Sequence, residues 1–180
     1  MDIFADEFRD FLSLLNQHKV EHLLVGGYAV NIHGYHRPTG DLNVWANPIP
    51  ANILRLADAI AAYGYETGPL REFAPQVAAV GLKMELNEPP VLIDVLAQIS
   101  GVQFESVYAR HRTYFMEGLE IHLINRDDLI ISKMSSNRPK DQDDVQKLHG
   151  LEAIVKGRKL EAYERPDQLP NAGPADPDPA

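Results

Sequence analysis

Residues 23–45 read LLVGGYAVNIHGYHRPTGDLNVW, and the order of patterns in this stretch decides the fold class. An apolar run over residues 22–25 ends at two glycines, which is typical of a strand that enters a tight turn. Residues 28–33 predict a short helix that the next glycine ends. Polar and apolar residues then alternate over 41–45 with a period of two, which predicts a second strand. Strand, turn, helix and strand in this order indicate an α/β domain.

The flanking sequence continues this mixture of helices and strands. Apolar side chains at helical spacing predict helices over residues 2–18 with Asp2 as the N-cap, 50–63 closed by Gly64, 104–110, 126–135 and 141–163. Alternation or short apolar runs predict strands over residues 80–86, 91–96 and 119–124, the first two antiparallel to each other. Residues 65–76 fit neither pattern.

The chain of 180 residues is long enough for one core-forming domain and too short for two ordinary ones. Its hydrophobic share of 44% is that of a globular protein. We therefore expect a single domain over residues 1–164. Residues 165–180 are dominated by Pro, Asp, Ala and Gly, a composition that predicts a disordered tail.

Charge and composition exclude several classes of protein. The formal net charge is −9 and the pI is about 5.2, which argues against broad non-specific coating of DNA or RNA. The absence of cysteine excludes disulfides, thiolate metal sites and cysteine nucleophiles. The N-terminal segment lacks the basic and apolar parts of a signal peptide, and no stretch approaches the roughly 18 apolar residues of a membrane span. We expect a cytoplasmic protein with no membrane partner.

Three oxygen-bearing side chains stand out on the predicted strands. Asp41 and Asn43 are two residues apart and therefore point the same way, while Asp94 interrupts an otherwise apolar strand. A carboxylate in such a run is costly unless a cation or an arginine pairs with it. If the two strands are neighbours, the three side chains converge, and hard oxygen ligands of this kind suit Mg²⁺. A structural salt bridge is the other explanation of Asp94.

The two glycines at the strand-to-helix junction are the candidate phosphate site. Backbone N–H groups at such a junction can hold a phosphate, and Gly26 and Gly27 allow its close approach because they have no Cβ. An ordinary turn that ends a strand has the same sequence, so the pattern alone leaves both interpretations open.

These stretches, with VLIDVL at 91–96, resemble the minimal nucleotidyltransferase fold, a small mixed sheet flanked by helices. The similarity is to small bacterial proteins of the abortive-infection nucleotidyltransferase toxin type. In that family a glycine turn holds the nucleoside triphosphate, a T-x-D-x-D strand supplies two metal ligands, and a later strand supplies a third carboxylate. The resemblance assigns these roles to Gly26 and Gly27, to Thr39, Asp41 and Asn43, and to Asp94.

Residues 127–148, DDLIISKMSSNRPKDQDDVQKL, resemble the C-terminal segment of the same family, which carries a lysine and an R-x-K-D-x-x-D pattern. These positions are Lys133, Arg138, Lys140, Asp141 and Asp144. The resemblance implies that the three cationic residues contact the nucleotide, with Lys133 reaching the triphosphate as a catalytic point charge. The residues alone leave two plainer interpretations: Lys133 could extend its ammonium to water, and Asp141 and Asp144 could form an N-cap and an acidic first turn.

The resemblance implies transfer of a nucleoside monophosphate from an NTP to a hydroxyl acceptor, with Mg²⁺ or Mn²⁺ as cofactor. The acceptor is an RNA, a protein side chain or a small molecule such as an aminoglycoside. Asn43 departs from the motif, because an amide oxygen can bind Mg²⁺ but brings no negative charge. A catalytically inactive nucleotide-binding protein, or one partner of a toxin–antitoxin pair, is therefore the alternative function.

Overall fold

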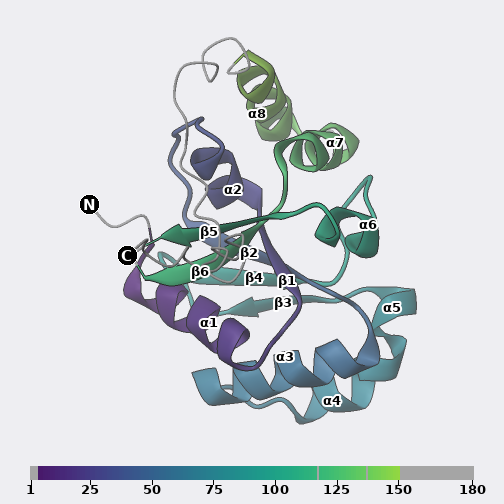
Figure 1. Ribbon diagram of the computed structural model, residues 1–180. Coiled ribbons are helices and arrows are strands. Elements are labelled where there is room, and N and C mark those ends of the chain that lie inside the picture. Colours follow the sequence, from purple (N-terminus) through teal and green to yellow (C-terminus); the bar gives the residue numbers. More distant parts are fainter. Residues whose placement is uncertain (1–3, 117, 137, 151–180) are drawn as a thin grey trace, which may run out of the picture.

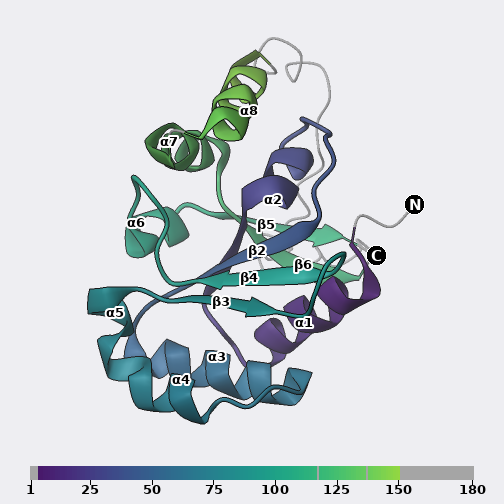
Figure 2. The same ribbon diagram turned by 180° about the vertical axis from the view of Figure 1, so that it is seen from behind.

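The computed structural model describes residues 4–116, 118–136 and 138–150. Within these residues the strands form one mixed six-stranded sheet in the order β3-β4-β2-β1-β6-β5, and helices lie on both of its faces (Figures 1 and 2). The strands are β1 (His22–Val25), β2 (Asp41–Ala46), β3 (Lys83–Leu86), β4 (Leu92–Leu96), β5 (Arg112–Met116) and β6 (Leu119–Leu123). The expected α/β class and mixed sheet are confirmed.

Strand pairing brings the two polar strands together at the centre of the sheet. β2 is antiparallel to β1 and parallel to β4, and Asn43 and Asp94 are direct partners in the second pair. β3 and β4 are antiparallel, as the sequence predicts. β6 runs parallel to β1 and antiparallel to β5.

The helices largely follow the predicted ranges. They are α1 (Asp6–Gln17), α2 (Gly26–Ile32), α3 (Pro50–Tyr63), α4 (Gly68–Phe73), α5 (Val77–Val80), α6 (Phe104–Tyr108), α7 (Arg126–Ser136) and α8 (Pro139–Gly150), with a 3₁₀ turn at Ala74–Gln76. Gly64 ends α3 in the left-handed conformation at φ 110°, as expected of a C-cap glycine. None of the helices among the described residues is long and apolar enough to cross a membrane.

Several boundaries differ from the sequence predictions. Ala5, rather than Asp2, is the N-cap of α1, and Asp2 lies outside the described residues. The last described helix begins at Pro139, whose ring is compatible with the first turn of a helix. The expected extension of this helix to residue 163 and the tail over 165–180 also lie outside the described residues.

Two regions of the fold were not predicted. The stretch that fits neither pattern folds into α4 and the 3₁₀ turn, and β3 starts only at Lys83, because α5 ends at Gly81 with a φ of 80°. β5 is a sheet-edge strand whose residues are exposed or half-buried, so its sequence lacks the apolar alternation of a half-buried strand.

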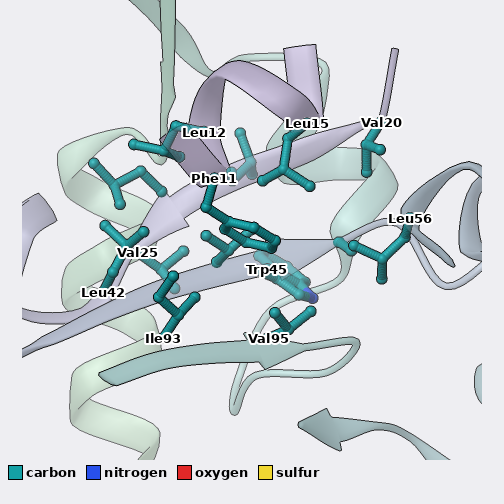
Figure 3. Close-up of a cluster of buried hydrophobic side chains, with 14 of the residues drawn as sticks. Phe11, Leu12, Leu15, Val20, Val25, Leu42, Trp45, Leu56, Ile93 and Val95 are labelled. Atoms are coloured by element: carbon teal, nitrogen blue, oxygen red, sulfur yellow. The ribbon is translucent and has the colours of Figure 1, made fainter. Parts of the chain in front are cut away.

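Successive side chains of β2 point to opposite faces of the sheet. Leu42 and Val44 are fully buried towards the face that α1 and α3 cover, whereas Asn43 faces the side of α7. Figure 3 shows Phe11, Leu56 and other side chains from α1, α3, β1, β2 and β4 packed together in this core. The rigid core fixes the backbone on which the polar side chains of β2 and β4 stand.

Candidate functional site

A pocket of about 400 Å³ lies between the sheet and α7, where β1 passes into α2. This volume is within the range of small-molecule sites. Its lining comes from the β1–α2 junction, β2, the segment after β4 and the α7–α8 region: Val25, Gly26, Asn43, Leu96, Gln98, Ile99, Ser100, Leu129, Ser132, Lys133, Ser135, Ser136, Arg138 and Asp141. The pocket therefore joins segments that are far apart in sequence.

The expected glycine turn, Gly26 and Gly27, forms the first two residues of α2 rather than a separate turn ahead of the helix. Two close approaches shape it. Gly26 has a φ of 66°, which glycine adopts without strain, and a Cβ there would lie 2.8 Å from Asn43. A Cβ on Gly27 would overlap Thr39 Oγ1. The two glycines therefore let the start of α2 pack directly against β2 and the segment that leads into it.

Asp41 and Asp94 are close neighbours of Asn43, which lines this pocket. Asn43 is the Cα partner of Asp94 across the β2–β4 pair, and its Nδ2 donates a 2.7 Å hydrogen bond to Asp41 Oδ2. Asp94 Oδ1 is buried and has no hydrogen-bond partner among the described residues. The geometry therefore brings together the three side chains that the sequence singles out.

The electrostatics of Asp94 are those of a carboxylate short of positive charge. Burial raises its pKa; Lys83 lowers it, but the nearby charges of Asp41 and Glu85 raise it again. In the described ranges, no three His, Asp or Glu side chains are arranged to hold a metal ion, and the third candidate ligand here is the amide of Asn43. The oxygen donors fit Mg²⁺ in chemical type, with two formal negative charges from Asp41 and Asp94.

Lys133 lies at the pocket wall but is already paired. Its Nζ is 2.7 Å from Asp141 Oδ1 and 2.7 Å from Asp144 Oδ2, and only 6% of the residue is exposed. The interpretation in which its ammonium extends into water is therefore wrong. Asp141 lies in the first turn of α8, as the plain interpretation expects, but neither Asp141 nor Asp144 is the N-cap. Both are buried, at 2% and 0% exposed, and both pair with cations.

Arg37 completes this ion-pair cluster from the loop before β2. Its Nε and Nη2 donate hydrogen bonds of 2.6 and 2.8 Å to the two oxygens of Asp144. Burial would raise the pKa of Asp141, but hydrogen bonds from Lys133, Ser136 and Arg138 outweigh it and hold the pKa at about 2. The sequence places Arg37 near the glycine turn but contains no local signal for a partner 107 positions away.

The remaining predicted contacts divide into two groups. Arg138 lines the pocket, and its side chain is 75% exposed while Nε donates to Asp141. Lys140 is exposed and does not line the pocket, and Thr39 packs against Gly27 with a buried Oγ1 that has no hydrogen-bond partner in the described structure. The arrangement therefore favours Arg138 over Lys140 as a residue that faces a ligand.

Two charged residues of β3 were missed by the sequence argument. Lys83 and Glu85 alternate with buried residues and so face the same side of the sheet as Asp94. Lys83 Nζ is 2.6 Å from Glu85 Oε1 and 3.6 Å from Asp94 Oδ1. The period-two pattern of β3 is the signal that could have identified them.

The fold is similar to that of a solved antibiotic adenylyltransferase. The lincosamide antibiotic adenylyltransferase LnuA, bound to lincomycin, superimposes with a TM-score of 0.54 at 15% identity, over 84% of this chain and 99% of that chain. The antibiotic-resistance factor ANT(2'')-Ia matches with a TM-score of 0.46 at 10% identity, over 84% of this chain and 90% of that chain. The first of these likenesses supports the fold alone.

Comparison of sequences leads to the family. No curated protein matches this chain significantly. The model of a family described as "Nucleotidyltransferase of unknown function (DUF6036)" matches residues 5–156, which is most of the chain. These residues include the glycine turn, the β2 and β4 carboxylates and the ion-pair cluster. The chain belongs to this family of nucleotidyltransferases.

Proposed function

We propose that the protein transfers a nucleoside monophosphate from an NTP to a hydroxyl acceptor in the pocket between the sheet and α7. One observation carries the proposal: Gly26, Asn43 and Arg138 line the same pocket, and Asp41 and Asp94 are immediate neighbours of Asn43. A phosphate binder, an oxygen-rich strand pair and an exposed guanidinium are the parts that phosphoryl transfer requires.

Asp41 and Asp94 are the proposed ligands of Mg²⁺ or Mn²⁺, with the amide oxygen of Asn43 as the third. Asp94 Oδ1 supports this assignment, because it is buried and makes no hydrogen bond in the described structure, with the Lys83 ammonium 3.6 Å away, so that a bound cation would satisfy it better. When bound, such a cation neutralises phosphate charge and orients the reacting groups.

The chain's own residues would position the nucleotide. Backbone N–H groups at Gly26 and Gly27 approach the phosphates, and the Arg138 guanidinium neutralises part of their charge. The ion pairs of Lys133 with Asp141 and Asp144 hold α7 and α8 together beside the pocket. The two carboxylates therefore partly neutralise the charge with which Lys133 would act on the phosphates. The acceptor hydroxyl attacks the α-phosphorus, its proton is released, and pyrophosphate leaves as the bond to the β-phosphate oxygen breaks.

A second candidate function rests on Asn43. Because this residue brings no negative charge, the protein could bind a nucleotide without turning it over, and act through a protein partner such as the other member of a toxin–antitoxin pair. The same pocket serves both functions. The two differ in whether pyrophosphate is released.

Thermal unfolding with each NTP, with and without Mg²⁺, tests the shared site. A nucleotide at about 100 times its Kd adds roughly 2.7 kcal/mol of stability. We expect a metal-dependent shift of the unfolding midpoint in the natural protein that disappears in Asp41→Ala. The shift should persist in Asp10→Ala, which removes the same charge from an exposed position of α1. The absence of a shift with every NTP would contradict both functions.

Transfer of label from an α-labelled NTP separates the two functions. Labelled product from the natural protein supports transfer. Binding without product in the natural protein, together with product from Asn43→Asp, supports the inactive alternative.

A further inference from the structure

We propose that Glu85 supplies the negative charge that Asn43 lacks, and that the Lys83 ammonium holds Glu85 and Asp94 together in the place where the divalent cation binds. The inference rests on the proposed function, since it concerns the cation site at Asp41 and Asp94. It assigns a role to β3, the edge strand that the family motifs do not include.

The register of the sheet places Glu85 next to the site. Glu85 and Asp94 are direct partners across the antiparallel β3–β4 pair, and Asp94 is in turn the partner of Asn43. The three residues therefore form one row across the face of the sheet that carries Asp41. Opposite residues in such a pair have Cβ atoms about 5 Å apart. In the described conformation Glu85 is paired with Lys83 and the three carboxylates do not form a metal site, so the Glu85 side chain would have to turn towards Asp94 to reach the same cation, directly or through a water molecule.

Two carboxylates opposite each other need a cation between them. Like charges at directly opposed positions of an antiparallel pair are destabilising. Here Lys83 Nζ lies 2.6 Å from Glu85 Oε1 and 3.6 Å from Asp94 Oδ1, so one ammonium touches both. Because Asp94 Oδ1 still lacks a hydrogen bond, the ammonium satisfies its charge only partly.

The formal charge shows what Glu85 adds. Asp41 and Asp94 contribute a charge of −2, and Glu85 brings the total to −3. A site with Asp at position 43, formed by positions 41, 43 and 94 alone, would also carry −3. The side chains of Lys83 and Glu85 are each 56% exposed, so the ammonium can turn out to solvent when a divalent cation binds. The cation and Lys83 therefore compete for the same carboxylates.

Mn²⁺ binding to the full chain without nucleotide tests the proposal, with free Mn²⁺ followed by electron paramagnetic resonance. Glu85→Gln should weaken Mn²⁺ binding by about 10- to 100-fold, the range for residues that support a metal site. Lys83→Gln should strengthen it, because the competing ammonium is gone. Adding Asn43→Asp to Glu85→Gln should restore affinity towards that of the natural protein.

Control variants separate a local effect from net charge. Glu72→Gln on α4 and Lys147→Gln on α8 make the same charge changes on exposed residues away from the sheet face, and each should leave Mn²⁺ affinity unchanged. Unfolding midpoints show that each variant is folded. Equal Mn²⁺ affinity in Glu85→Gln and the natural protein, or an equal loss in Glu72→Gln, would overturn the inference.

The same titration distinguishes failure of this inference from failure of the proposed function. If the natural protein binds Mn²⁺ and Glu85→Gln binds it equally well, Glu85 has no role and the proposed site stands. If only Asn43→Asp binds Mn²⁺, Glu85 does not replace the missing charge, and this inference fails together with the cation site proposed for the natural protein. If neither the natural protein nor Asn43→Asp binds Mn²⁺, the cation site and this inference both fail.

Discussion

Asp144 holds the guanidinium of Arg37 with two hydrogen bonds, of 2.6 and 2.8 Å, while its carboxylate is completely buried. The same carboxylate lies 2.7 Å from Lys133 Nζ. One anion thus neutralises two cations that come from the loop before β2 and from α7. Removing it would leave buried positive charge without enough compensation.

Asp144→Asn should therefore destabilise the fold by about 3 kcal/mol or more, the usual cost of breaking a buried ion pair from one side. Asp143→Asn is the matched control, since Asp143 is exposed and accepts one hydrogen bond from the Tyr35 hydroxyl. Its cost should stay below about 1 kcal/mol. Urea unfolding measures both, and equal midpoints for the two variants would contradict the proposed importance of the cluster.

Gly27→Ala should displace the segment that carries Thr39, because the new Cβ would overlap Thr39 Oγ1. We expect a loss of about 1–3 kcal/mol of stability, typical of overpacking, and a weaker thermal shift with nucleotide. Gly40→Ala is the control, since a Cβ there meets nothing within 4 Å. Unfolding curves with and without NTP check both effects; an unchanged Gly27→Ala would show that the turn tolerates a side chain.

Arg138→Ala should weaken nucleotide binding by about tenfold, the value of a hydrogen bond to a charged group, with little loss of stability. The reason is that Arg138 is largely exposed and lines the pocket. Lys140→Ala removes the same charge two positions away and outside the pocket lining, so its nucleotide affinity should not change. Titration with a fluorescent NTP compares the two, and equal losses would indicate a diffuse charge effect.

His22 makes stability depend on pH below neutrality. Burial lowers its pKa from 6.5 to about 3, with a further decrease from His122, so the folded side chain stays neutral while the unfolded one is protonated. Protons therefore bind His22 more strongly in the unfolded state. This binding should lower the free energy of unfolding by about 2 kcal/mol as the pH falls from 7 to 5.

His22→Asn is the test of this dependence, since its amide can still donate to the Val20 carbonyl that lies 2.8 Å from His22 Nδ1. As the pH falls from 7 to 5, the unfolding free energy of the natural protein should decrease relative to that of the variant. A difference that is constant over this range would mean that His22 does not titrate as stated.

The sequence predicted the part of the site that local periodicity encodes. Alternation over β2 puts Asp41 and Asn43 on one face, and the apolar run around Asp94 identifies a central strand next to it. β5 was missed because an edge strand whose residues are exposed or half-buried has no such pattern. The periodicity of a strand reflects the burial of one face, so it gives little signal where a strand is only partly buried.

The ion-pair cluster was out of reach for a different reason. A lysine on an apolar helix and two aspartates at the start of the next helix have ordinary local explanations. Only the packing of α7 on α8 and the approach of the Arg37 loop show that these charges neutralise one another. Long-range pairing of this kind depends on the assembled fold, so neither propensity nor spacing contains it.

The contact between Arg37 and Asp144 also sets an order of events during synthesis. The glycine turn and β2 leave the ribosome early. Arg37 lies in the loop between them, but its partner Asp144 is synthesised more than a hundred residues later. A nascent chain that has not yet reached α8 lacks the anion that Arg37 and Lys133 share. The proposed nucleotide pocket is therefore completed among the last parts of the described fold, and a ribosome-bound chain stalled before residue 141 should not bind nucleotide.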